Sequence, residues 1–211
     1  KFCHCSCMQG KYKRIWIWQL LSCCTGTFGD VIMERYQKLF KYINTDCALI
    51  TSDVNRRYFT GMKSSAGIVI AFPEKLYLLI DFRYIEKARA TVKNAEVIEL
   101  ENTGKQLSEL LKKHNSHTMS IESETMTVKL LNSYKHFLKE VDIDESDSLS
   151  NAINRLRTVK DDSEIDCIRK AQEIAEKSLD ELIPFIHEGK TEREVAMELN
   201  RLMFANGAED L

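Results

Sequence analysis

The sequence contains few residues that interrupt regular structure, with only 2 prolines and 8 glycines among 211 residues. It also lacks a dominant charge, because 32 acidic side chains oppose 30 lysines and arginines and leave a formal net charge of −2. Nucleic acids and anionic membranes attract proteins through clustered positive charge, so we expect neither as a partner. The sequence has no run of about 18 apolar residues, the length that a membrane-spanning helix needs. We therefore expect no membrane-spanning segment.

The rest of the composition is that of an ordinary folded protein, with 44% hydrophobic and 29% charged residues. The hydrophobic fraction is high and the net charge is small, so buried surface can offset the entropy that folding costs. Extensive disorder is therefore not expected. A chain of this length can form one or two domains with a sizeable core.

Residues 1–32 differ in composition from the rest of the chain. Five of the seven cysteines and both tryptophans lie there. The cysteines could bind a metal, but their spacing differs from the C-x2-C pairs of structural zinc sites. The apolar run 15–21, preceded by basic residues, could be a secretory signal, although it is short for one. We favour a third hypothesis, that this leader is not native protein and that the native start is Met33.

The two cysteines outside the leader, Cys47 and Cys167, lie far apart in the sequence and within apolar patterns. Such cysteines are usually buried, reduced thiols rather than parts of a disulfide framework. This pattern favours a cytoplasmic protein.

From Met33 to about residue 150, short apolar runs alternate with helical patterns. Strands are expected at residues 47–50, 65–72, 75–80, 95–100, 118–121 and 141–143, and helices at 34–42, 83–92, 106–113 and 127–139. The short Pro-Glu connection between the second and third strands predicts a hairpin. Helices that alternate with strands predict an α/β domain with a mixed sheet and flanking helices. We place this domain at residues 33–157.

Two longer helices are expected in residues 158–211, where no strand pattern occurs. Asp161 with Glu164, and Thr191 with Glu194, have the spacing of helix-starting capping pairs. An apolar stripe recurs at helical spacing in the first helix, at Ile168, Ala171, Ala175, Leu179 and Leu182. No sheet in this part of the sequence can cover that stripe, so we expect the chain either to self-associate through these helices or to fray there.

Two segments carry a resemblance to a known family. Residues 46–61 (DCALITSDVNRRYFTG) and 81–84 (DFRY) resemble the N-terminal domain of the aminopeptidase P, prolidase and creatinase family. Residues 156–196 and the run GAED at 207–210 resemble the first helices of that family's catalytic pita-bread domain. The resemblance implies a creatinase N-terminal-like domain followed by two helices of a truncated pita-bread α+β domain.

The resemblance also implies an activity. It points to a cytoplasmic, homodimeric metallopeptidase that removes a residue preceding proline or cleaves an Xaa-Pro dipeptide. Two divalent metal ions (Mn, Co or Zn), held in that family by two Asp, one His and two Glu, would activate water and polarise the scissile carbonyl. Those ligands lie beyond the turn at which this sequence ends. We therefore expect no catalytic residue, metal ligand or cofactor in this chain, and an inactive fragment of an active parent protein.

The residues themselves give no competing catalytic motif. The sequence has no H-E-x-x-H, G-x-S-x-G or glycine-rich nucleotide-binding motif. His114, His117, His136 and His187 are expected to be solvated or to cap helices rather than to bind a metal.

One candidate ligand site follows the third expected strand. Asp81, Arg83 and Tyr84 could form a site at the carboxyl edge of the sheet, where α/β proteins bind ligands. The simpler interpretation, which we favour, is that Asp81 caps the next helix and Arg83 pairs locally.

A second candidate is the segment around the Thr-Gly step. The guanidinium of Arg57 could bind a peptide carboxylate, although the run 55–58 is equally consistent with a polar turn. In the resembling family, the loop after this step reaches the active site of a neighbouring subunit. The resemblance therefore implies Met62, Lys63 and Ser64 as substrate-loop residues.

A different class of function remains open. The same α/β domain could be a non-catalytic module that binds a small molecule or peptide or that dimerises. The coding sequence after Leu211 distinguishes the two hypotheses, because an ordered set of Asp, Asp, His, Glu and Glu would support the peptidase.

Overall fold

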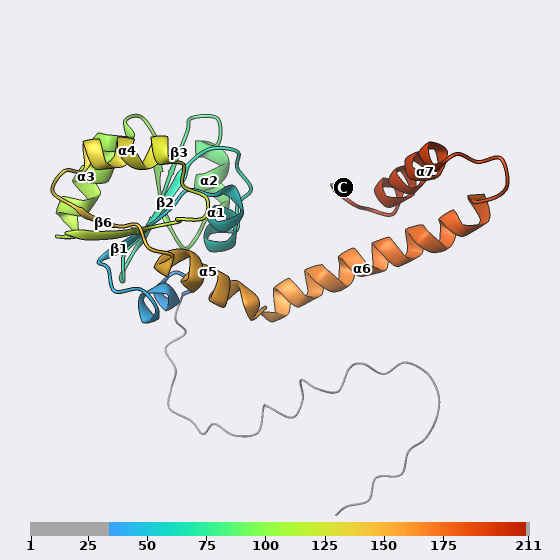
Figure 1. Ribbon diagram of the computed structural model, residues 1–211, viewed down its shortest axis with the longest axis horizontal. Helices are drawn as coiled ribbons and strands as arrows, with labels where there is room; N and C mark the ends of the chain where they lie inside the picture. Colours follow the sequence, from blue (N-terminus) through green and yellow to red (C-terminus); the bar gives the residue numbers. More distant parts are fainter. Residues whose placement is uncertain (1–33, 210–211) are drawn as a thin grey trace, which may run out of the picture. The chain divides into compact units, whose positions relative to one another are not determined.

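The computed structural model describes residues 34–209 (Figure 1). The leader hypotheses concern residues 1–32 and therefore lie outside the described residues. The six strands are β1 (Cys47–Ile50), β2 (Ile68–Ala71), β3 (Leu76–Ile80), β4 (Glu96–Glu99), β5 (Thr118–Ile121) and β6 (Asp142–Asp144). They form one sheet in the order β4-β3-β2-β1-β5-β6, in which β2 runs antiparallel to both neighbours and the other pairs are parallel. The expected mixed sheet is confirmed.

Helices cover both faces of this sheet (Figure 1). They are η1 (Gln37–Lys41), α1 (Asp53–Thr60), α2 (Ile85–Thr91), α3 (Thr103–Lys113), α4 (Val128–Phe137) and α5 (Ser148–Thr158). One core cluster packs Ala48 and Ile50 against η1, α1, α2 and α5, whereas the other packs Cys47 and Leu49 against α3 and α4. Successive strand residues point to opposite faces. Because both faces are buried, the central strands are continuous apolar runs.

The hairpin between β2 and β3 forms as the Pro-Glu connection predicts. The backbone amide of Phe72 donates to the carbonyl oxygen of Lys75 at 2.8 Å, and the Lys75 amide donates back at 3.2 Å. At the other end of β2, Gly67 has a φ of +123°, and a Cβ atom there would lie 3.0 Å from the carbonyl oxygen of Leu79. Only glycine fits this close approach of two strands.

Two helices of the sheet region were not expected. The run 55–58 is not a polar turn but lies within α1, where the Ser52 hydroxyl accepts from the Asn55 amide at 3.3 Å. Gly61, at a φ of +72°, ends this helix. The apolar stripe of α1 is too short for the helix to be recognised from the periodicity of the sequence. In α5, by contrast, the buried Leu149, Ala152 and Ile153 have helical spacing that sequence reasoning overlooked.

Smaller corrections concern helix type and burial. The first expected helix is a short 3-10 turn, η1. Cys47 is buried as expected, but Cys167 is exposed. Cys167 lines a groove, and its apolar neighbours in the sequence did not indicate that it is exposed.

The C-terminal helices are α6 (Asp162–Leu182), η2 (Ile183–Phe185) and α7 (Glu192–Ala205). Both capping boxes are present, at Asp161 with Glu164 and at Thr191 with Glu194. The two long helices pack on each other, and the side-chain amide of Asn206 donates to the hydroxyl of Ser178 at 3.1 Å.

The expected apolar stripe of α6 is partly uncovered. Ile168 and Leu179 are 55% and 51% exposed, and Ala171 is exposed as well. The expectation is wrong for Leu182, which is buried in the α6–α7 pair together with Leu202. One stripe of the helix therefore has a partner and a neighbouring stripe has none among the described residues.

Candidate functional site

The candidate site lies at the carboxyl edge of the sheet, where β1, β3 and β5 end. Glu122, directly after β5, has a carboxylate that is only 1% exposed. It accepts from the backbone amides of Thr51 and Ser52 at 2.5 and 2.8 Å, and from the side chains of Ser52 and Asn55 at 2.9 and 2.6 Å. Burial of a carboxylate is costly unless such donors surround it. Glu122 thus fixes the start of α1 to the end of β5.

A buried arginine holds the loop that follows α1. Arg56 is 4% exposed, and its guanidinium donates to the carbonyl oxygens of Thr51 and Ser64, the latter at 2.9 Å. Burial lowers the pKa of Arg56, against the opposing effect of the carboxylates of Asp53 and Glu122. These bonds fix the shape of the loop between α1 and β2.

The four substrate-loop candidates separate into two exposed and two buried side chains. Arg57 and Lys63 are exposed, whereas Met62 and Ser64 are 4% and 7% exposed. Met62 packs into the core cluster that contains α1, and the Ser64 carbonyl accepts from Arg56. Arg57 and Lys63 are therefore the accessible members of this group.

Asp81, Arg83 and Tyr84 lie beside this loop. The Arg83 amide and Nε atom donate to the Asp81 carboxylate at 3.1 and 3.0 Å, and the hydroxyls of Tyr84 and Ser65 lie 2.8 Å apart. The hydrogen bond from the Arg83 side chain lowers the pKa of Asp81, and the contact with Ser65 lowers that of Tyr84. Ser65 follows Ser64 in the loop after α1. The Tyr84–Ser65 contact therefore brings the two predicted candidate groups side by side.

The expectation for Asp81 is half right. Arg83 does pair locally, but Asp81 does not cap α2, whose N-cap residue is Tyr84 and has no side-chain cap. The helix begins later than the sequence pattern indicated. The Asp81 carboxylate therefore accepts hydrogen bonds from Arg83 in the turn that precedes the helix. Phe82, between the paired residues, is 72% exposed.

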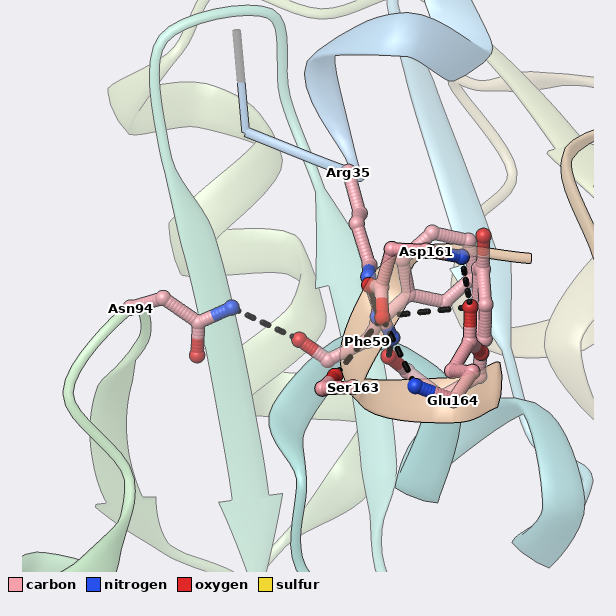
Figure 2. Close-up of polar contacts among 7 residues, drawn as sticks. Arg35, Phe59, Asn94, Asp161, Ser163 and Glu164 are labelled. Atoms are coloured by element: carbon pink, nitrogen blue, oxygen red, sulfur yellow. Dashed lines mark hydrogen bonds and ion pairs between the residues drawn. The ribbon is translucent and has the colours of Figure 1, made fainter. Parts of the chain in front are cut away.

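A groove of about 920 Å³ lies along the exposed side of α1, next to the end of α5 and the start of α6. Arg57 lines it. Figure 2 shows one wall, where Arg35 donates to the carbonyl oxygen of Tyr58 at 3.1 Å and pairs with Asp161. Hydrogen bonds, first from the Ser163 hydroxyl and then from the Glu164 amide and Arg35, hold the pKa of Asp161 well below its usual range.

Neighbouring contacts fix both ends of α1. The Asn94 side chain donates to the carbonyl oxygen of Phe59 at 2.7 Å (Figure 2). Arg157, from α5, donates to the Asn55 side chain at 3.1 Å. Since Asn55 also donates to Glu122, one chain of hydrogen bonds runs from α5 through α1 to the end of β5.

The histidines have ordinary structural contacts. His114 is the C-cap residue of α3, as one of the two expected roles had it, but its side chain is not solvated: the ring stacks on Phe72 at a centroid distance of 3.9 Å, and its Nε2 atom lies 2.9 Å from the Tyr77 hydroxyl. His187 contacts the Glu188 carbonyl oxygen at 2.9 Å. Between residues 34 and 209, no three His, Cys, Asp or Glu side chains are grouped so that they could hold a metal ion. In the same range, no helix has the length and apolar character that crossing a membrane would take.

Sequence reasoning missed Glu122 and the buried role of Arg56. Glu122 offered the same signal as Asp81, an acidic residue directly after a buried strand. Arg56 offered no such signal. It stands beside Arg57 in a polar run, and the sequence does not indicate which of the two arginines is buried.

Comparison with known proteins identifies the family. The Creatinase/Prolidase N-terminal domain family matches residues 33–159. The chain is 32% identical over 180 residues to an Xaa-Pro dipeptidase of Pyrococcus furiosus and 29% identical over 178 residues to an uncharacterized peptidase of Bacillus subtilis. These matches cover 83% and 84% of this chain and 49% and 50% of the relatives.

Solved structures agree with this assignment. An Xaa-Pro dipeptidase from Bacillus anthracis has a TM-score of 0.78 at 25% identity, over 84% of this chain and 50% of that one. The prolidase from Pyrococcus furiosus has a TM-score of 0.72 at 30% identity, over 84% and 54% of the two chains. The fold is that of a creatinase-type α/β domain. The chain belongs to the creatinase/prolidase N-terminal domain family, and it spans about half the length of the curated relatives it matches.

Proposed function

We propose that this chain is the N-terminal part of a cytoplasmic, metal-dependent Xaa-Pro peptidase of the aminopeptidase P or prolidase type. The observation that carries the proposal is the extent of the matches. They continue past the family domain at residues 33–159 to cover 83–84% of the chain, in relatives that include an Xaa-Pro dipeptidase. The substrate would be a proline-containing peptide, and the active form would be a homodimer. We place the domain boundary at residues 157–158.

A pair of metal ions would complete such an enzyme. Among residues 34–209, no three His, Cys, Asp or Glu side chains are grouped so that they could hold a metal ion. We propose that the two Asp, one His and two Glu lie beyond Leu211, and that the 211-residue chain alone does not hydrolyse peptides. When bound, the metal ions would supply the hydroxide and polarise the scissile carbonyl.

The contribution of this chain would be substrate binding by the loop after α1. Arg57 and Lys63 are exposed cations that could attract the carboxylate of a peptide. Met62 and Ser64 would anchor the loop, since both are buried. Arg56 and Glu122 would position it, through the carbonyl oxygen of Ser64 and the start of α1.

The test uses the parent protein encoded by the whole gene. Release of an amino acid from an Xaa-Pro peptide, dependent on added Mn²⁺ and abolished by a chelator, is expected from the parent and not from the 211-residue chain. Lys63→Ala in the parent should raise KM about tenfold with little change in kcat, because it removes a binding charge. The matched control is Lys87→Ala, which changes an exposed lysine of α2 and should leave both constants unchanged. A coding sequence that stops at Leu211 would favour the binding or dimerisation module instead.

A further inference from the structure

The groove beside α1 carries more positive than negative charge. Four cationic side chains line it: Arg35, Arg57, Arg157 and Lys160. Among the described residues that line the groove, Glu164 alone carries a carboxylate. That carboxylate lies 3.6 Å from the guanidinium of Arg35, which also pairs with Asp161 (Figure 2). The other three cations therefore determine the charge of the groove.

These three cations have no acidic partner. Between residues 34 and 209, no ion pair joins Arg57, Arg157 or Lys160 to a carboxylate. Arg157 donates to the side-chain oxygen of Asn55 at 3.1 Å, and the Lys160 ammonium donates to the carbonyl oxygen of Thr158 at 3.2 Å. Both acceptors are neutral, and guanidinium and ammonium groups have further N–H donors. The groove thus keeps both charge and donors for a ligand.

The ends of two helices account for part of this charge. Arg57 and Arg157 lie in the last turns of α1 and α5, where a cation interacts favourably with the helix dipole. The dipole is equivalent to about half a unit charge, so it offsets each arginine only in part. An anionic ligand would complete the compensation.

Arg157 is held in position without a ligand. The Asn55 side chain that accepts from it also donates to Glu122 at 2.6 Å, and Glu122 is only 1% exposed. A side chain that is already fixed loses less conformational entropy when it binds a ligand. Arg157 is therefore a preorganised donor at the wall of the groove.

The groove also has apolar and neutral polar walls. Val54 of α1 and Ile168 of α6 line it and are 54% and 55% exposed. Asn154, Thr158 and Ser163 add side-chain amide and hydroxyl groups, which can bond to a peptide backbone. An inorganic anion would leave the apolar wall uncovered, and a purely apolar ligand would leave the cations without a counter-charge.

We propose that this groove binds the free carboxyl end of a peptide whose last side chain is apolar. The carboxylate accepts from the guanidinium groups of Arg57 and Arg157 beside the Lys160 ammonium, and the last side chain contacts Val54 and Ile168. The inference extends the role proposed above for Arg57, and in that respect it rests on the proposed function. Binding needs no cleavage, so binding to this chain and hydrolysis by the parent protein can fail separately.

The first test is an NMR titration of the 211-residue chain with acetyl-Ala-Leu, and with its carboxyl-terminal amide as the uncharged control. The acid should shift the side-chain signals of Arg57 and Arg157 saturably and give nuclear Overhauser effects from its leucine methyl groups to Val54 and Ile168. The amide should bind at least about fivefold more weakly, because it carries no charge. Equal affinity of the two compounds, or no contact with Val54 and Ile168, would overturn the proposal.

Two simpler anions test whether a peptide is needed. Hexanoate has a carboxylate and an apolar chain but no peptide groups, and inorganic phosphate has only charge. Each should bind at least about threefold more weakly than acetyl-Ala-Leu, because each lacks some of the proposed contacts. If either binds as tightly as the peptide, the groove is a fatty-acid or general anion site and the proposal is wrong.

Charge variants provide the next test. Arg57→Met and Arg157→Met should each weaken peptide binding about fivefold, the upper end for a solvent-exposed ion pair. Arg155→Met is the matched control on α5, because Arg155 lies over the ring of Tyr42 at 4.6 Å, and it should bind as the wild type does. If Arg157→Met fails to fold, Arg57→Met decides, since wild-type affinity in that variant contradicts the proposed contacts.

The apolar wall is tested in the same way. Ile168→Ala should weaken peptide binding about threefold, because it removes apolar surface that the last side chain covers. Leu179→Ala, which changes a 51% exposed residue of the same helix, should leave binding unchanged. An equal loss in both variants, or a loss in neither, would show that Ile168 does not hold the last side chain and would overturn the proposed binding mode.

Discussion

The sheet region, residues 35–158, and the helical region, residues 161–206, differ in how completely they cover their apolar residues. Each face of the sheet has its own buried cluster, with helices packed against it. The α6–α7 pair buries Leu182 and Leu202 but leaves Ile168, Met197 and Phe204 55%, 63% and 53% exposed. The helical spacing of apolar residues thus predicts that a helix forms, but it does not indicate what the helix packs against. The proposed continuation of the protein beyond Leu211 would provide the missing cover.

The largest expected effect belongs to the sheet region. Glu122→Ala removes a buried acceptor from five donors of Thr51, Ser52 and Asn55. We expect a loss of about 3 kcal/mol in the free energy of unfolding, measured by urea denaturation, because buried donors without acceptors are costly. Glu101→Ala, at an exposed site, is the control and should change stability by less than about 0.5 kcal/mol. A similar small effect for Glu122→Ala would mean that this carboxylate does not hold the sheet edge.

A smaller effect is expected in the helical region. Leu182→Ala should destabilise the α6–α7 pair by about 2 kcal/mol, the low end for a buried leucine, because one side of the pair is open. Ile168→Ala should cost almost nothing and should reduce any self-association through the exposed stripe. Circular dichroism measures the loss of stability, and analytical ultracentrifugation measures self-association. Equal losses of stability in Leu182→Ala and Ile168→Ala would contradict the proposed difference between the two faces of α6.

The smallest expected effect concerns the contact between Arg35 and Asp161. The folded-state pKa of Asp161 lies below the value of about 3.9 in an unfolded chain. The carboxylate therefore stabilises the folded state fully above that value, and the contribution is lost as the pH falls through the folded pKa. A carbon-detected NMR titration should give an Asp161 midpoint well below that of a free Asp. Ser163→Ala and Arg35→Met should each raise the midpoint, and unchanged midpoints in both variants would contradict this account.

The sequence predicted the strands well because both faces of the sheet are covered. Cys47–Ile50 and Leu76–Ile80 are apolar at every position, a pattern that is recognisable without knowing their neighbours. The α6 and α7 capping boxes were equally local signals, since each joins residues three apart. Side-chain burial was not predicted where the decisive contact was distant in sequence, as for the ring of His114, which stacks on Phe72.

The candidate site could be predicted only in part. Asp81, Arg83 and Lys63 were recognisable from their places at strand and helix ends. The link between the two candidate groups, Tyr84 to Ser65, depends on how β2 and β3 pair and could not be deduced from spacing. The buried Arg56 was beyond sequence reasoning for the same reason, because the loop that covers it is shaped by the sheet.

Amide hydrogen exchange on the dilute 211-residue monomer tests the central claim most directly, that the sheet region is complete and the α6–α7 region is not. We predict slow exchange in the strands near Ile50, Ile70 and Leu79, because these amides open only with the sheet core. Exchange after Asp161 should be much faster, because little buried apolar surface holds those helices closed. Uniformly slow exchange in both regions would show that the two helices find a full partner within this chain, and it would contradict the proposed boundary and the need for a covering sheet from elsewhere in the protein.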